Sequence, residues 1–509
     1  MNLRVDWRSS CSLVGTVVKW LAVALLFPLA LAIFYGEGTT TFLATIVIAI
    51  AVGWALEQLD DDPDLGAREG FLMVALTWLA VSVVGALPYV IAGEGTVAHP
   101  VNALFESMSG FTTTGATVMG SIGFESHSRA LLMWRQLTQW LGGMGIVVLA
   151  VAILPELSVG GAQLMDAEAP GPGIQKLTPR IAETASALWK AYLGITALEV
   201  FLLYGLHLIG LAPNMTLYQA VAHGFTTMAT GGFSPAARSI EFFSAAVQWL
   251  IIPFMIAAGT NFALYWHALN GEPKIFIEDN EFRFYLGVLG ALSALLTILL
   301  FTGIGFSNDP LVAPIIGNFE SSLRHSTFQL VSIVTTTGYA SMDFNTWGSS
   351  AQYLLLAAMF IGGSAGSTGG AIKIVRWLVV LKLLKRELFT TIHPEAIRPV
   401  RLNGQALDER AVRGIYTFTL LYLLLFFGAT LLVFLDSTRV GLQMNTTEAM
   451  SAVASTLGNV GPGFDIIGPM NNYLPFPATT KLFMVFLMWI GRLEILPVLV
   501  LLTPAYWRS

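Results

Sequence analysis

Long apolar stretches alternate with short polar interruptions along this chain. About 20 apolar residues in a helix cross a bilayer core. Ten stretches approach or exceed that length, and the pattern therefore predicts a helical membrane protein with ten spans. The interval 350–383 is too long for one simple span and is interrupted by glycine-rich sequence at 362–370. The predicted spans are residues 13–34, 41–57, 70–92, 130–153, 187–211, 242–268, 281–304, 350–383, 411–435 and 478–502.

Four shorter segments lie between paired spans and are too short to cross. They are residues 102–112, 216–227, 320–334 and 443–456, and we interpret them as re-entrant helices. Each is followed by a strip containing threonine and glycine, at 112–116, 228–232, 335–339 and 455–459. Backbone carbonyls in such strips could not face lipid, but they could line a watery path and replace the hydration shell of an ion.

The strips recur at similar intervals, which predicts an internal repeat. Matching the glycines at 115, 231, 338 and 458 gives four units, each reading span, short helix, strip and span. The expected fold is an all-α polytopic membrane protein with four fused repeats around one pore and two extra N-terminal helices. The predicted boundaries are 1–69 for the extra spans, then 70–153, 154–268, 269–386 and 387–509 for the repeats.

Composition agrees with a membrane protein and excludes several other classes. Hydrophobic residues make up 55% of the 509 residues and charged residues 11%, against roughly 25% charged in soluble domains. The single cysteine, Cys11, excludes an internal disulfide, and the net charge of −6 does not suggest a nucleic-acid partner. The chain shows no catalytic constellation, so we do not expect an enzyme.

Basic residues predict the orientation, because loops on the cytoplasmic side carry an excess of Lys and Arg. With both termini in the cytoplasm, ten spans leave only six of the 26 basic residues on the outer side. The densest basic stretch, 373–413, is then cytoplasmic. It is explained either by the orientation signal alone or by a docking surface for a cytoplasmic partner.

The strips, the repeat and the glycine-rich break together resemble the Trk/Ktr/HKT superfamily of cation transporters. The most specific segments are 110–117, 230–233, 335–339 and Gly491-Arg492. The likeness is greatest to the bacterial Trk-type potassium-uptake membrane subunit. It implies potassium uptake across the bacterial inner membrane, K⁺ as the ion carried, no covalent cofactor, a homodimer with one pore per protomer, and a cytoplasmic nucleotide-binding regulatory subunit.

The strips are the predicted selectivity filter, in which rings of oxygen atoms replace the water around a dehydrated cation. In the resembling superfamily, glycine at all four filter positions goes with potassium transport. The filter residues are Thr112, Thr113, Thr114, Gly115, Ala229, Thr230, Gly231, Thr336, Thr337, Gly338, Thr456, Leu457, Gly458 and Asn459. Of these, K⁺ is expected at Thr113, Thr114, Ala229, Thr230, Thr336, Thr337, Thr456 and Leu457.

Two features below the predicted filter are candidates for a gate. Arg492 lies within the last predicted span, where a buried charge is costly and functional by default. It is either a pore-facing charge that limits cation flow or a packing partner of Glu494. The second candidate is the loop Gly362, Gly363, Gly366, Ser367, Thr368, Gly369 and Gly370. In the resembling superfamily such a loop obstructs the pore; a packing kink is the simpler explanation.

Two other transport mechanisms remain open. One is a coupled symporter that carries K⁺ with H⁺ or Na⁺, which would need an acidic residue near the middle of the membrane. The sequence shows no convincing one. The other is a sodium-selective pore, which glycine at position 115 disfavours.

Overall fold

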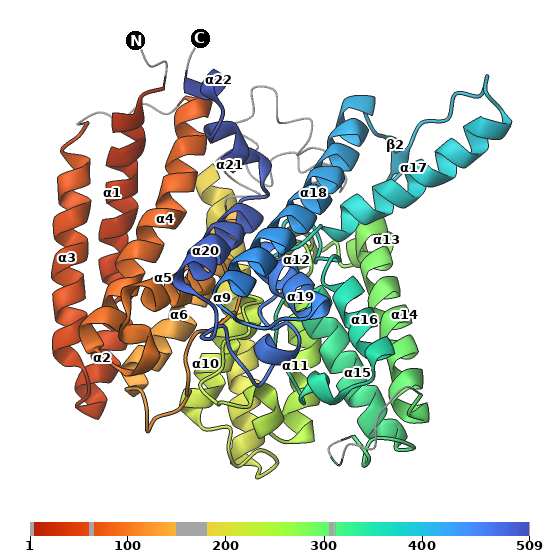
Figure 1. Ribbon diagram of the computed structural model, residues 1–509. Coiled ribbons are helices and arrows are strands. Elements are labelled where there is room, and N and C mark those ends of the chain that lie inside the picture. The colour runs from red at the N-terminus through yellow and green to blue at the C-terminus, as the bar shows by residue number, and fades with distance from the viewer. Residues whose placement is uncertain (1–4, 61–65, 149–180, 305–309, 311, 508–509) are drawn as a thin grey trace.

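The computed structural model describes residues 5–60, 66–148, 181–304, 310 and 312–507. In these ranges the chain forms helices and one hairpin of two-residue strands, β1 (Arg401–Leu402) and β2 (Gln405–Ala406). Figure 1 shows most of the longer helices side by side in one bundle. The expected all-α membrane fold is confirmed.

Six helical segments of the described residues are long and apolar enough to cross a membrane. They fall at the predicted spans 13–34, 41–57, 70–92, 187–211, 281–304 and 411–435. The first consists of two helices that meet at Leu25. The helices are α1 (Trp7–Ala24) with α2 (Leu26–Tyr35), α3 (Thr39–Glu57), α4 (Ala67–Ala92), α9 (Ile181–Leu208), α14 (Asn280–Thr302) and α18 (Glu409–Arg439).

The four short segments are confirmed as helices, and polar residues set where they begin. A side chain from His99, Thr216, Asn318 or Asn445 accepts a backbone N–H at each N-terminus. Such caps satisfy N–H groups that have no partner inside the helix. In the last helix, Asn445 and Glu448 form a reciprocal capping box. The helices are α5 (Pro100–Phe111), α10 (Leu217–Met228), α15 (Phe319–Val334) and α19 (Thr446–Leu457). We call them pore helices.

Of the other four predicted spans, two contain breaks that the sequence did not predict, and a third, 350–383, is interrupted where its glycine-rich sequence indicated. The span 242–268 bends by 92° between α11 (Ala245–Ala258) and α12 (Phe262–Leu269). The span 350–383 consists of α16 (Ser349–Ala358), a non-helical segment and α17 (Ile374–Ile392). The span 478–502 breaks after α20 (Ala478–Arg492), where Glu494 and Ile495 have positive φ, and continues as α21 (Leu496–Leu501).

The remaining one, 130–153, is helical as α6 (Arg129–Val148), and residues 149–153 lie outside the described ranges. Glycine and polar side chains are the physical reason for the breaks. Buried positions facing other helices tolerate them, whereas lipid-facing positions do not. Two short helices complete the list: α13 (Ile275–Glu278) and α22 (Pro504–Trp507).

Each pore helix packs against the long helix before it and the helix after it. The groups are α4, α5 and α6; α9, α10 and α11; α14, α15 and α16; and α18, α19 and α20. Neighbouring groups also touch: α6 contacts α10, α11 contacts α15, and the Phe360 ring just after α16 packs against the Phe426 ring of α18. The helix α20 contacts α5, so the last group returns to the first. One arrangement therefore occurs four times around a closed circuit.

The N-terminal end of α1, the helix α22 and the hairpin after α17 lie toward the same end of the bundle (Figure 1). The hydroxyl of Tyr506 in α22 donates to the carbonyl oxygen of Arg68 near the start of α4. Helix α17 extends away from the bundle on this side. The basic stretch 373–413 thus lies toward the end of the molecule where the described chain begins and finishes.

Candidate functional site

Four residues with the same left-handed backbone define the register of the strips. Each lies two residues after the end of its pore helix. They are Thr113, Thr230, Thr336 and Asn459, with φ of 51°, 50°, 59° and 54°. Two residues further on, each strip has a glycine with positive φ: Gly115, Gly232, Gly338 and Gly461. We call these four residues the register glycines. The four strips therefore share one backbone conformation.

The register predicted from sequence was wrong in the second and fourth strips. Gly232 and Gly461, rather than Gly231 and Gly458, are equivalent to Gly115 and Gly338. The prediction aligned the strips by their threonine and glycine residues. The feature that repeats in the structure is instead the residue with left-handed backbone, and in strip four this residue is an asparagine. Asparagine tolerates this conformation better than most side chains.

The shift of register moves three of the predicted oxygen positions. Thr456 and Leu457 belong to α19, and the Thr456 hydroxyl donates to the carbonyl oxygen of Ala452 within that helix. Ala229 is the residue that caps α10. The residues equivalent to Thr113 and Thr114 are Thr230 with Gly231 in strip two, Thr336 with Thr337 in strip three, and Asn459 with Val460 in strip four.

The strips touch one another in chain order, and the last touches the first. A Cβ atom added at Gly115 would lie 2.2 Å from the carbonyl oxygen of Gly231. The corresponding distances are 2.0 Å from Gly232 to Thr337 O, 2.1 Å from Gly338 to Val460 O, and 2.7 Å from Gly461 to Thr114 O. Any side chain at these glycines would therefore collide with the neighbouring strip, so four backbones meet around a common centre.

One hydrogen bond holds every strip to its own pore helix. The N–H of Thr114 donates to the carbonyl oxygen of Ser109 at 2.8 Å. The equivalent bonds join Gly231 to Thr226, Thr337 to Ser332 and Val460 to Ser455, each also at 2.8 Å. Each of these strip N–H groups is thus satisfied by a helix carbonyl just upstream, as buried backbone requires.

A cavity of about 130 Å³ lies on one side of the junction. Its lining includes the register glycine of every strip: Gly115, Gly232, Gly338 and Gly461. Most of the remaining lining comes from the loops that follow the strips, between residues 116 and 122, 234 and 239, and 462 and 473. The four strips therefore meet at a polar cavity.

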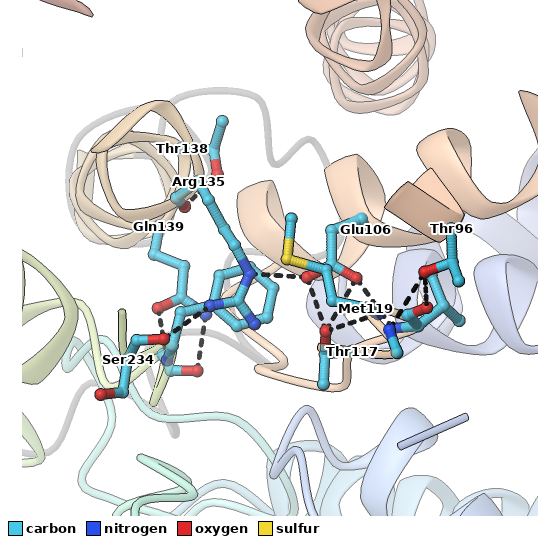
Figure 2. Close-up of polar contacts among 12 residues, drawn as sticks. Thr96, Glu106, Thr117, Met119, Arg135, Thr138, Gln139 and Ser234 are labelled. Carbon is cyan, nitrogen blue, oxygen red and sulfur yellow. Dashed lines mark hydrogen bonds and ion pairs between the residues drawn. The ribbon is translucent and has the colours of Figure 1, made fainter. Parts of the chain in front are cut away.

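A buried ion pair holds the first strip beside the second (Figure 2). The Nε of Arg135 in α6 lies 2.6 Å from Oε1 of Glu106 in α5, and both side chains are at most 2% exposed. The other oxygen of Glu106 accepts the N–H of Val118 at 2.9 Å. Arg135 also donates to the carbonyl oxygen of Ser234, and its guanidinium lies over the Phe233 ring.

Other pore-helix side chains play similar parts in strips two and three. His223, Glu106 and Gln329 each lie seven residues before the left-handed residue of their strip. A ring nitrogen of His223 lies 3.0 Å from the Ser234 hydroxyl, and Gln329 donates to the Tyr339 carbonyl oxygen at 3.1 Å. His223 is thus a hydrogen-bonded packing residue. The Tyr339 hydroxyl reaches Thr226 in the pore helix of the preceding group.

The glycine-rich segment 362–370, with Ala371 directly after it, contacts the chain at the C-terminal ends of three pore helices. The N–H of Gly370 donates to the Thr336 hydroxyl at 2.7 Å, and that of Ala371 donates to the Gly458 carbonyl oxygen at 2.9 Å. The Thr368 hydroxyl donates to the carbonyl oxygens of Met228 and Ala258.

The same segment is also fixed to its surroundings through backbone groups. The N–H of Ser364 donates to the Gly259 carbonyl oxygen, and that of Ala365 donates to buried Glu281 at 2.7 Å. The predicted loop is therefore an ordered element with polar contacts on several sides, rather than a simple helix kink.

Arg492 ends helix α20 and is only 3% exposed. Its Nη1 donates to the carbonyl oxygen of Thr368 at 2.7 Å, so both candidate gate features are in contact. Its Nη2 lies 3.5 Å from the Gly142 carbonyl oxygen. Glu494, the packing partner considered for Arg492, forms an ion pair with Arg376 of α17.

Sequence reasoning missed Arg135 and Gln139, although both lie in the predicted span 130–153. Gln139 donates to the Gly231 carbonyl oxygen at 2.6 Å and accepts the N–H of Phe233 at 3.0 Å. The rule that selected Arg492, that a buried polar group at membrane depth has a function, would also have selected these two.

Almost the whole chain matches one family of membrane proteins. The family model described as TrkH, cation transport protein, matches residues 38–509. The chain belongs to the TrkH family. The "Trk system potassium uptake protein TrkH" of Escherichia coli K12 is 36% identical over 99% of this chain and 100% of its own length. The protein of the same description from Halomonas elongata is 36% identical over the full length of both chains.

A solved TrkH structure shares the fold. The crystal structure of the potassium transporter TrkH from Vibrio parahaemolyticus matches with a TM-score of 0.84 at 34% identity. The match covers 99% of this chain and 100% of the solved chain. TrkH membership confirms the resemblance recognised in the strips and agrees with the expectation of a transporter rather than an enzyme.

In this TrkH-family chain, breaking the buried ion pair between Glu106 and Arg135 should strongly destabilise the fold. Glu106→Gln leaves Arg135 charged in a buried site, which costs roughly 3–5 kcal/mol. We expect a large fall in the thermal unfolding temperature of the purified protein. Glu387→Gln, which removes an exposed carboxylate from Arg386 while Glu409 remains paired with it, should change the unfolding temperature little.

The double variant Glu106→Gln with Arg135→Met should be more stable than Glu106→Gln alone, because it removes the unpaired charge. If Glu106→Gln unfolds at the wild-type temperature, the pair does not hold the strips together.

Proposed function

We propose that this protein takes up potassium ions through a channel-like pore formed where the four strips meet. The observation that carries the proposal is the closed circuit of strips, in which each register glycine lies against the carbonyl of the next strip. A coupled carrier does not need four equivalent backbones around one centre, whereas a cation filter does. The names of the Escherichia coli and Halomonas relatives supply the ion.

In this proposal the ion is held by oxygens from equivalent positions in each strip. The register assigns Thr113 and Thr114, Thr230 and Gly231, Thr336 and Thr337, and Asn459 and Val460 to these positions. The carbonyl oxygen of Gly231 also accepts from Gln139, and Asn459 donates to the Thr114 hydroxyl at 2.9 Å. Strips two and four therefore differ from one and three, which suggests fewer well-defined ion sites than in a symmetric filter.

Glycine occupies all four register positions, including Gly232 and Gly461 in the corrected alignment. The association of four glycines with potassium transport therefore applies with the new positions. The carboxyl ends of the four pore helices come directly before the strips. Their negative dipole ends favour a cation there.

The gate in this proposal is the segment 362–370 together with Arg492. The segment and the adjacent Ala371 contact strip three and the C-terminal end of α19, and Arg492 donates to the Thr368 carbonyl oxygen. A positive charge at this point disfavours a passing cation. Helix α17 continues directly from the segment, so a force applied to α17 would reach it.

The domain boundaries, assembly and orientation predicted from sequence complete the proposal. Two N-terminal helices precede four repeats, both termini are cytoplasmic, and the protein forms a homodimer in a bacterial inner membrane. A cytoplasmic nucleotide-binding subunit regulates it. The position of the basic stretch 373–413 at the same end of the bundle as α22 supports one common side for these parts.

Ion flux into liposomes containing the purified protein tests this function. We expect Rb⁺, as a K⁺ substitute, to enter down its own gradient with no Na⁺ or pH gradient present. Na⁺ should enter more slowly. Uptake that requires a Na⁺ or pH gradient would contradict a channel-like route.

Gly115→Ser should weaken selectivity. Its side chain would meet the Gly231 carbonyl and is strained at a φ of +79°, at a cost of roughly 1–2 kcal/mol. We expect the ratio of Na⁺ to K⁺ permeability to rise about threefold, equivalent to roughly 0.7 kcal/mol. Gly115→Ala controls for strain without a hydroxyl, and Gly205→Ala, in open space on α9, controls for helix substitution. Unchanged reversal potentials in the serine variant would remove Gly115 from the filter.

Arg492→Ala should increase K⁺ flux, because it removes both the charge and the bond to Thr368. We expect about a fivefold rise, corresponding to roughly 1 kcal/mol off the barrier. Arg492→Lys keeps the charge and should stay near the wild-type rate. Flux at or below wild type in a folded alanine variant would show that Arg492 is structural.

A coupled symporter is the second candidate, and one observation favours it. Glu199 of α9 is fully buried and lies beside Thr227 of the pore helix α10. The sequence reasoning found no such acidic residue. A carboxyl group at membrane depth is a candidate carrier of a proton.

Glu199→Gln distinguishes the two mechanisms, because glutamine keeps the shape and cannot titrate. In the proposed channel, K⁺ flux is independent of the pH gradient in both forms. A symporter would instead show uptake driven by a pH gradient in the wild type and its loss in Glu199→Gln. The measurement is Rb⁺ uptake into liposomes with and without an imposed pH gradient.

A further inference from the structure

A basic pocket lies between the C-terminal half of α17 and the chain that follows this helix. Its volume is about 340 Å³. Five of the eight lining residues are basic, and none is acidic. The lining consists of Lys382, Lys385, Arg386, Ile397, Arg398, Pro399, Val400 and Arg401.

The positive charge of this pocket is only partly neutralised. Arg386 forms ion pairs with Glu387 and Glu409, whose side chains are more than half exposed. Lys382 donates to the carbonyl oxygen of Arg401 at 2.7 Å, which joins α17 to the opposite wall without cancelling charge.

Two further cations have no acidic partner among the described residues. The Arg398 guanidinium lies over the Phe389 ring at 4.7 Å. Lys385 is exposed and forms no hydrogen bond or ion pair within the part of the chain that the structure describes. Both can donate to an anion without breaking an existing ion pair.

A row of exposed apolar side chains runs along the same helix. It consists of Leu381, Leu384, Leu388 and Ile392, which are 49% to 74% exposed, and Ile397 at the pocket is 98% exposed. The spacing of three or four residues places the four on one face of α17. A helix with a basic face beside an apolar face is typical of segments that lie in the membrane interface.

We propose that the pocket binds the phosphate headgroup of an anionic phospholipid, with its acyl chains along the apolar row of α17. A phospholipid accounts for both features at once. A soluble phosphate compound would account for the five cations but would leave the row in water. A second copy of this chain would cover the row but would bring the same five cations to the pocket.

This inference goes beyond the proposed ion pathway. It rests on that proposal only for the membrane leaflet concerned, which is the cytoplasmic one. Because α17 continues from the segment 362–370, a lipid bound here would restrain the helix that leads to the proposed gate.

Native mass spectrometry of the full-length purified protein tests the proposal. The probes are phosphatidylglycerol and phosphatidylcholine with identical acyl chains. We expect phosphatidylglycerol to bind about tenfold more tightly, and Lys385→Gln with Arg398→Gln to abolish most of that preference. The matched control is Arg410→Gln with Arg413→Gln, which removes two exposed charges of nearby α18 outside the pocket and should keep the preference.

Other outcomes would overturn the proposal. Equal binding of the two lipids, or equal loss in the pocket and control variants, would exclude a headgroup site. Displacement of phosphatidylglycerol by inorganic phosphate or ATP at matched concentration would assign the pocket to a soluble phosphate compound. A shift of oligomeric state in Leu384→Gln with Leu388→Gln would assign the row to a second copy.

Two further points keep the test independent of folding and of transport. If the double pocket variant does not fold, Lys385→Gln alone replaces it, because that side chain is exposed and has no described partner. Lipid binding is measured without ion flux, so failure of the channel proposal and failure of this one give different results.

Discussion

Backbone polar groups at membrane depth must find partners inside the protein. In this chain that requirement is met by one bond repeated four times, from the second residue after each helix cap back to a carbonyl in the pore helix. The bond fixes the left-handed residue and turns the strip away from the helix axis. The four register glycines, the contacts between neighbouring strips and the cavity all follow from this turn.

The side chains that hold the four strips in place differ from one strip to the next. Glu106 with Arg135 uses an ion pair, His223 and Gln329 use hydrogen bonds, and strip four uses Ser455 and Tyr473, which both donate to the Gly461 carbonyl oxygen. The backbone conformation is therefore common to the four strips, whereas the supporting chemistry is not. Near-identical geometry with unequal support is expected when four repeats have diverged within one chain.

The helices that face lipid could be predicted from the sequence, because their apolar length is a direct consequence of bilayer thickness. The pore helices were also predictable, because four segments between paired spans are too short to cross the bilayer. The breaks at Gly259 and after Arg492 were harder, because buried helices need no continuous apolar pattern. The register of strip four was not predictable from the threonine and glycine pattern, because Asn459 takes the left-handed backbone conformation that a threonine takes in the other three strips.

The contact between strip four and strip one has a consequence for how the protein is made. Asn459 reaches the Thr114 hydroxyl across 345 positions, and Trp489 donates to the Ala75 carbonyl oxygen across 414. Strip one contacts strips two and four, so most of the remaining chain must be synthesised before both of its neighbours are present. Contacts this distant in sequence form late, because closing a long loop is entropically unfavourable. The central cavity would thus be the last part of the molecule to take shape, and a chain released early would contain helices but no closed circuit of strips.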